Sequence, residues 1–128
     1  MRLRFLLLVL PCSALFTNLS YAAAGHYTLC SAYYGLLMAA GDQPSISRET
    51  SSFAYLTFFK LAGGDSKAEG EVAVIMAQIA KDIPKGEMTP RNIAPVRARF
   101  DAPCQMILLD ELSKMNKSPE KRDTATPP

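Results

Sequence analysis

Three cysteines and one histidine are the side chains of this chain best suited to chemistry. They are Cys12, Cys30, Cys104 and His26. A catalytic thiol needs a base beside it, and a zinc site needs several Cys or His ligands at close spacing. The cysteines lie far apart, and no Cys-x-x-Cys-His haem motif, glycine-rich phosphate loop or nucleophile elbow occurs. The sequence therefore predicts no catalytic residue, no metal site and no cofactor, and we expect a protein that is not an enzyme.

The first 24 residues have the composition of a secretory signal peptide. Arg2 and Arg4 form a positive start, an apolar run covers residues 5–16, and mostly small residues occupy positions 22–25. A membrane anchor needs about 20 apolar residues, and this run is shorter. We therefore expect residues 1–24 to be removed on export, which places the protein in a periplasm or outside the cell without stable membrane insertion.

This leader decides how Cys12 and His26 are interpreted. Cys12 lies inside it and follows Pro11, whereas a lipid-attachment cysteine follows a small residue, so we expect Cys12 to be discarded. Cleavage after Ala23 would leave an amino-terminal Ala-Gly-His sequence, which binds Cu(II) or Ni(II) in a square plane of nitrogens. That cut would also put Tyr21 where a small residue is favoured. We therefore expect His26 to be an ordinary terminal side chain.

Removal of the leader leaves two cysteines, Cys30 and Cys104. An even number of cysteines in an oxidising compartment predicts a disulfide. The bridge would close a long loop in a domain of about a hundred residues, whose core is small. We therefore expect it to supply much of the stability.

Composition limits the domain count and the partners. Of the 14 basic residues, Arg2 and Arg4 belong to the leader, and all 12 acidic residues follow it, so the rest of the chain has no formal net charge. Without a basic surface, we expect no binding to nucleic acid or to an anionic membrane. Residues 25–117 suit a single domain. Residues 118–128, rich in Lys, Glu, Thr and Pro, are expected to form a disordered tail.

Apolar residues at intervals of three and four predict three helices, over residues 26–40, 48–62 and 66–83. Glycine or proline follows each of them and ends it. Ser66 and Glu69 have the spacing of a capping box at the start of the third helix.

Two further helices are predicted over residues 90–100 and 101–115. Each begins with a capping residue close before a proline, Thr89 in one case and Asp101 in the other. No segment alternates with period two. We therefore expect an all-α bundle of about five helical segments.

The expected disulfide supports the fourth segment. In a four-helix up-and-down bundle the first and last helices are antiparallel, so the starts of these helices, where Cys30 and Cys104 would lie, are too far apart to be bridged. Residues 90–100 are expected to reverse the chain once more, which makes the outer helices parallel.

Aromatic side chains are concentrated in the first two predicted helices, where they point in several directions. A helix that is apolar on several faces is either central in a bundle or exposes one face to a partner, and both interpretations remain open. If a partner binds, the anchors we predict are Tyr33, Tyr34, Tyr55 and Phe58.

Two groups of charged residues lie late in the domain. They are Arg91, Arg97, Arg99 and Asp101 in one group and Asp110, Glu111 and Lys114 in the other. At helical spacing such residues usually form a solvated face with local pairs. We interpret both groups as ordinary surface charges.

These features together indicate a non-enzymatic protein-binding module, with another envelope or secreted protein as its partner. An inhibitor or immunity protein against a cell-wall or toxin enzyme has this size, this disulfide and no catalytic groups. A periplasmic stress chaperone or envelope accessory protein is the alternative hypothesis. A homodimer fits either one.

Overall fold

The computed structural model describes residues 25–117. It consists of the helices α2 (His26–Ala40), α3 (Arg48–Leu61), α4 (Ser66–Ala80) and α5 (Ala94–Lys117), with a 3-10 turn η2 (Pro84–Gly86) before α5. Over this range the only β-pairing is an isolated bridge between Gln43 and Ile46. The predicted all-α fold is confirmed. The predicted leader, residues 1–24, and the predicted tail, residues 118–128, lie outside the described residues.

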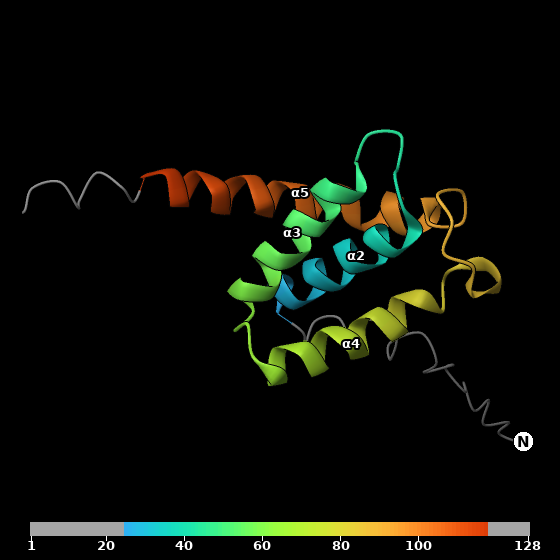
Figure 1. The fold of residues 1–128 in the computed structure, drawn as a ribbon, viewed down its shortest axis with the longest axis horizontal. Helices are drawn as coiled ribbons and strands as arrows, with labels where there is room; N and C mark the ends of the chain where they lie inside the picture. The colour runs from blue at the N-terminus through green and yellow to red at the C-terminus, as the bar shows by residue number, and fades with distance from the viewer. Residues whose placement is uncertain (1–24, 118–128) are drawn as a thin grey trace, which may run out of the picture.

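Helix α2 is the centre of the fold. Helices α3, α4 and α5 lie around it, and each of them contacts it (Figure 1). Residues 30–37 are all buried, because a helix that is apolar around its circumference must be covered on every side. At Gly35 a Cβ atom would lie 3.1 Å from Cε of Met76 on α4 and 3.3 Å from Cδ2 of Tyr55 on α3. The missing side chain therefore lets both neighbours approach α2 closely.

Side-chain caps define the starts of α3 and α4. The Ser47 hydroxyl accepts a hydrogen bond from the backbone N–H of Thr50 at 3.0 Å. At α4 the capping residue is Asp65, whose carboxylate accepts from the N–H of Ala68 at 2.9 Å. The predicted capping box at Ser66 was wrong by one residue, because the preceding aspartate has the extended backbone and the short acceptor that an N-cap needs.

Helix α4 ends at Ala80, earlier than the predicted end at residue 83. Ile83 has extended backbone angles, φ −89° and ψ 123°. Proline disfavours helical angles in the residue before it, and here that proline is Pro84. Ile83 is nevertheless buried, so the residues just after the end of α4 still pack in the core.

The last two predicted helices are one. Helix α5 continues through Pro103, so the bundle has four α-helices within the described range rather than five helical segments. A proline inside a helix costs about 3 kcal/mol, and contacts with α2 on both sides of it offset that cost. The Phe100 ring lies 5.9 Å from the Tyr33 ring, and Cys104 is covalently bonded to α2. The predicted boundary between helices at residues 100 and 101 was wrong, because the Asp101 side chain accepts a hydrogen bond from Tyr33 on α2 instead of capping a new helix.

The predicted bridge between Cys30 and Cys104 is present, with the two Cα atoms 5.4 Å apart. The predicted parallel arrangement of the outer helices was wrong, because α2 and α5 are antiparallel. Three pairs of residues establish this direction: Tyr27 with Glu111, Cys30 with Cys104, and Tyr33 with Asp101. The bridge forms in an antiparallel pair because Cys104 lies near the middle of a long helix.

Loss of the disulfide should destabilise the domain strongly. The bonded residues are 74 positions apart, and in the loop-closure model a bridge of this span contributes about 4 kcal/mol. We expect the double variant Cys30→Ser/Cys104→Ser to lose most of that amount in urea unfolding followed by circular dichroism. A reducing agent should destabilise the natural protein and leave the double variant unchanged. A loss below about 1 kcal/mol would show that packing alone holds α5 on α2.

Candidate functional site

The four predicted aromatic anchors do not form an exposed surface. Tyr33 and Phe58 have no exposed area, Tyr34 is 3% exposed, and Tyr55 is half-buried. The rings of Tyr34 and Phe58 stack in the core with their centroids 5.9 Å apart. Of the two interpretations left open by the sequence, the central core helix holds for α2, whereas α3 buries one side and leaves Phe53 exposed. The prediction of exposed anchors at Tyr33, Tyr34 and Phe58 was wrong.

A polar cluster lies beside these rings. The Tyr33 hydroxyl donates a hydrogen bond to the Asp101 carboxylate. Arg97 donates to the other oxygen of Asp101 at 2.8 Å and to the hydroxyl of Ser45 at 2.7 Å through the same nitrogen. The cluster therefore connects α2, α5 and the loop before α3. Arg97 and Asp101 are partly buried structural residues rather than the solvated pair that the sequence indicated.

The surroundings of this cluster keep its tyrosines neutral. Burial, together with the charge of Asp101, raises the pKa of Tyr34 to about 12. Burial and the hydrogen bond to Asp101 raise the pKa of Tyr33 as well. Both phenols therefore stay protonated to a higher pH than an ordinary tyrosine, and Tyr33 donates the hydrogen bond that connects α2 to α5.

A second polar cluster joins the start of α2 to the last turns of α5. Tyr27 donates a hydrogen bond to Oε1 of Glu111 at 2.7 Å, and Lys114 contacts the same oxygen at 3.0 Å. Lys114 also pairs with Asp110 at 2.8 Å, as its spacing predicted. Only 8% of Glu111 is exposed, and its carboxylate accepts hydrogen bonds from two side chains, so its interpretation as an ordinary surface charge was wrong. The hydrogen bonds from Tyr27 and Lys114 lower the pKa of Glu111.

Acid should loosen this end of α5. Because the pKa of Glu111 is lower in the folded state, its stabilising effect is present above the unfolded value of about 4.3 and is lost as pH falls through the folded value. We expect Glu111→Gln to lower the melting temperature at pH 7 and to reduce the fall in melting temperature between pH 6 and pH 3. The exposed Glu69 on α4 provides a control, because Glu69→Gln should leave the acid profile unchanged. Identical profiles for the natural protein and Glu111→Gln would contradict this role.

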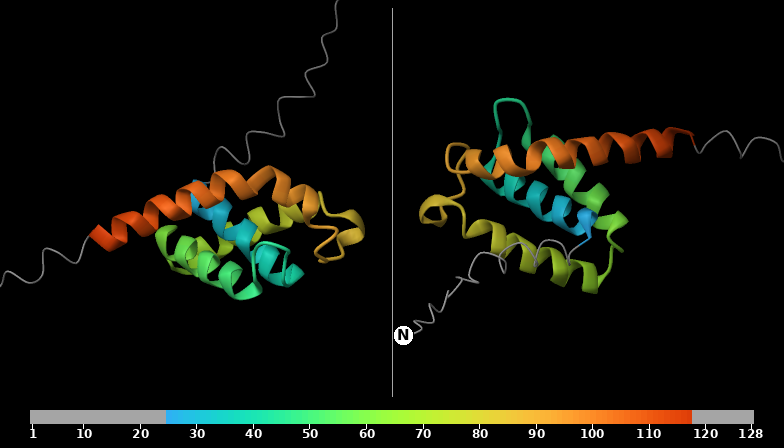
Figure 2. Two further views of the ribbon diagram at one scale, coloured as in Figure 1. Left: turned by 90° about the horizontal axis from the view of Figure 1, so that it is seen from above. Right: turned by 180° about the vertical axis from the view of Figure 1, so that it is seen from behind.

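Helix α5 carries apolar side chains on two opposite faces. Cys104 and Leu108 face the core, whereas Met106 and Leu109 are 72% and 63% exposed. At 100° per residue the two exposed side chains lie on the same side of the helix, directly away from α2. The carboxyl-terminal part of α5 extends past α2 and α3 in all three views (Figures 1 and 2). We call the exposed side, with Met106 and Leu109, the outer face of α5.

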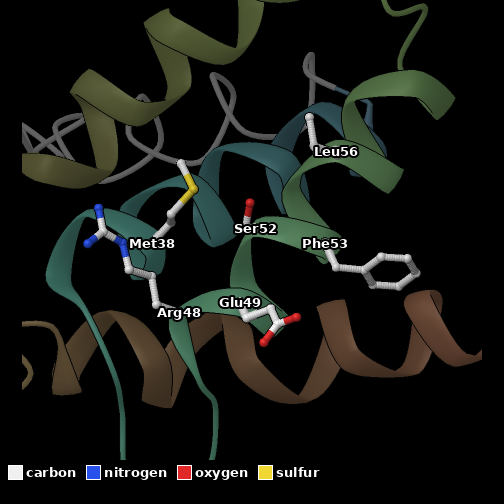
Figure 3. Close-up of a pocket in the computed structure, with 6 residues that line it drawn as sticks. All are labelled: Met38, Arg48, Glu49, Ser52, Phe53 and Leu56. Carbon is white, nitrogen blue, oxygen red and sulfur yellow. The ribbon is translucent and has the colours of Figure 1, made fainter.

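A second exposed apolar surface lies on α3. Phe53 and Leu56 are 53% and 50% exposed. Together with Met38 at the end of α2 they border an open hollow of about 550 Å³ (Figure 3). Arg48, Glu49 and Ser52 complete its lining. Most of the hollow is apolar, and it is bordered by charged side chains at one end.

In residues 25–117 no group of three His, Cys, Asp or Glu side chains is placed to hold a metal ion. His26 is exposed at the start of α2 and packs edge-on against Tyr27, with ring centroids 4.4 Å apart. No helix between residues 25 and 117 is long and apolar enough to cross a membrane.

Comparison of the chain with protein-family models, with curated proteins and with solved structures gave no match.

Sequence reasoning missed all four exposed apolar residues named above. Phe53 and Leu56 have the same helical spacing as the core positions of α3, so spacing alone does not distinguish them from core residues. Met106 and Leu109 lie between core positions of α5 and break its apolar stripe. The sequence did carry one signal of exposure, because these helices have more apolar residues than a single buried stripe needs. Apolar residues outside the main stripe of a helix either enter a second contact or stay exposed.

Proposed function

We propose that the protein is a non-enzymatic binding module that attaches to another envelope or secreted protein through the outer face of α5. The observation that carries this proposal is the exposure of Met106 and Leu109 on a helix whose opposite face is already buried. Contiguous exposed apolar side chains in a small protein commonly mark a contact with another protein.

The attachment of α5 to α2 suits such a role. The disulfide at Cys104 and the hydrogen bonds to Asp101 and Glu111 hold the helix at three points along its length. A helix held in place before binding loses little conformational freedom when the partner arrives, which favours affinity. The outer face is therefore a rigid surface rather than a flexible segment that folds on binding.

Occlusion of an enzyme is the mode of action that we favour. A rigid helix on the surface of a small domain can dock in a cleft with its exposed apolar face, in the manner of helix-in-groove recognition. The partner would be an enzyme of the cell wall or a secreted toxin enzyme, and the protein would act as its inhibitor or immunity protein. The predicted leader and the disulfide support a periplasmic or secreted location.

A stress chaperone is the second candidate, and the Tyr27–Glu111 hydrogen bond favours it specifically. Acid protonates Glu111 and weakens the contact between the ends of α2 and α5. The apolar side chains between these helices would then become accessible to unfolded clients. This function requires more binding in acid than at neutral pH, which inhibition of one enzyme does not.

The two functions are separated by capture from envelope extract with the purified, oxidised protein. We expect one stoichiometric enzyme at pH 7, and its activity should fall when the protein is added. The variant Met106→Gln/Leu109→Gln should weaken that complex roughly tenfold or more, because both side chains are central to the proposed contact.

The control for this test is Val74→Gln on α4. Val74 is 57% exposed, so the control removes an exposed apolar side chain from a different helix. It should leave capture and inhibition unchanged. Many weakly bound proteins that increase in number at low pH would support the chaperone instead, and full inhibition by Met106→Gln/Leu109→Gln would refute the outer face as the binding surface.

A further inference from the structure

One exposed stripe of α3 has the spacing of a helix-pairing seam. Its four residues are Glu49, Phe53, Leu56 and Lys60, at intervals of four, three and four. At 100° per residue these positions fall within a narrow sector of the helix. All four are exposed, while Ala54 and Phe58 on the opposite side are buried against α2. Intervals of three and four are those of the contact positions in paired helices.

The order of residues in this stripe is self-complementary. The two apolar residues lie in the middle, an acidic residue lies at one end, and a basic residue lies at the other. Among the described residues, neither Glu49 nor Lys60 makes an ion pair within the chain. Rotation of a second α3 by 180° about an axis between Phe53 and Leu56 places opposite charges together at both ends.

We infer that α3 pairs with α3 of a second copy of this chain, antiparallel about a two-fold axis. Phe53 of one copy packs on Leu56 of the second copy, and Glu49 pairs with Lys60 of the second copy. Two-fold symmetry makes each of these contacts twice, as in an isologous dimer. The hollow beside Met38, Phe53 and Leu56 gives the incoming side chains an apolar wall (Figure 3).

The size of the seam determines the strength of the dimer. From Glu49 to Lys60 the helix rises about 16 Å. A contact along one such stripe covers less than the roughly 800 Å² per partner of a stable complex. The dimer is therefore weak and concentration-dependent. It lies on a different helix from the outer face of α5, so it goes beyond the proposed function and does not depend on it.

Charge exchange between positions 49 and 60 tests this dimer. The protein purified after expression of the full chain is examined by sedimentation equilibrium from micromolar to millimolar concentration. Glu49→Lys and Lys60→Glu each turn two attractive pairs into two repulsive ones, and each should weaken dimerisation roughly tenfold. An equal mixture of the two single variants should dimerise as well as the natural protein, because every pair in the mixed dimer is again attractive. The double variant Glu49→Lys/Lys60→Glu should do the same.

Three further measurements keep the test decisive. Circular dichroism should show that each variant keeps its helix content, since all substituted positions are exposed. Phe53→Gln/Leu56→Gln should abolish dimerisation, whereas Met106→Gln/Leu109→Gln should leave it unchanged and thereby separate it from the function proposed for α5. A monomer at every concentration, or a dimer insensitive to the charge reversals and not restored in the mixture, would overturn the inference.

Discussion

Coverage of α2 on every side is the constraint on which the rest of the structure depends. Residues 30–37 of this helix are all buried, and one neighbouring helix could cover only one side of it. Helices α3 and α4 converge on it at Gly35, where the absence of a side chain permits close approach. The remaining side is closed by α5, which explains why this helix passes through Pro103 without a break. A bend at that point would uncover Tyr33 and the disulfide.

Three interactions with α2, spaced along α5, fix the position of this helix. The Cys30–Cys104 bond fixes its middle, the Tyr33–Asp101 hydrogen bond fixes the turn before, and the Tyr27–Glu111 hydrogen bond fixes the turns after. Because the inner face is held so firmly, the apolar residues on the opposite face cannot turn inward. Exposure of Met106 and Leu109 is thus a consequence of the attachment, and it is the feature from which a binding role is proposed.

The candidate surfaces were less accessible to sequence reasoning than the fold. Tyr33, Tyr34 and Phe58 are large and partly polar, which suggested anchors for a partner, yet each finds its contacts inside the bundle. Leu56 has the same helical spacing as core residues, yet it is 50% exposed. Periodicity identifies a stripe of apolar residues, but it does not reveal which of two stripes on one helix faces the neighbour.

The sequence by itself determined the all-α class, the first three helices to within a few residues, and the pairing of Cys30 with Cys104. These features depend on local periodicity, on capping and on the count of cysteines that remain after the predicted leader. Tertiary structure decided the continuity of α5, its antiparallel direction, the burial of Glu111 and the partial burial of Asp101. Each of these depends on contacts between residues far apart in the chain, and local spacing carries no information about such contacts.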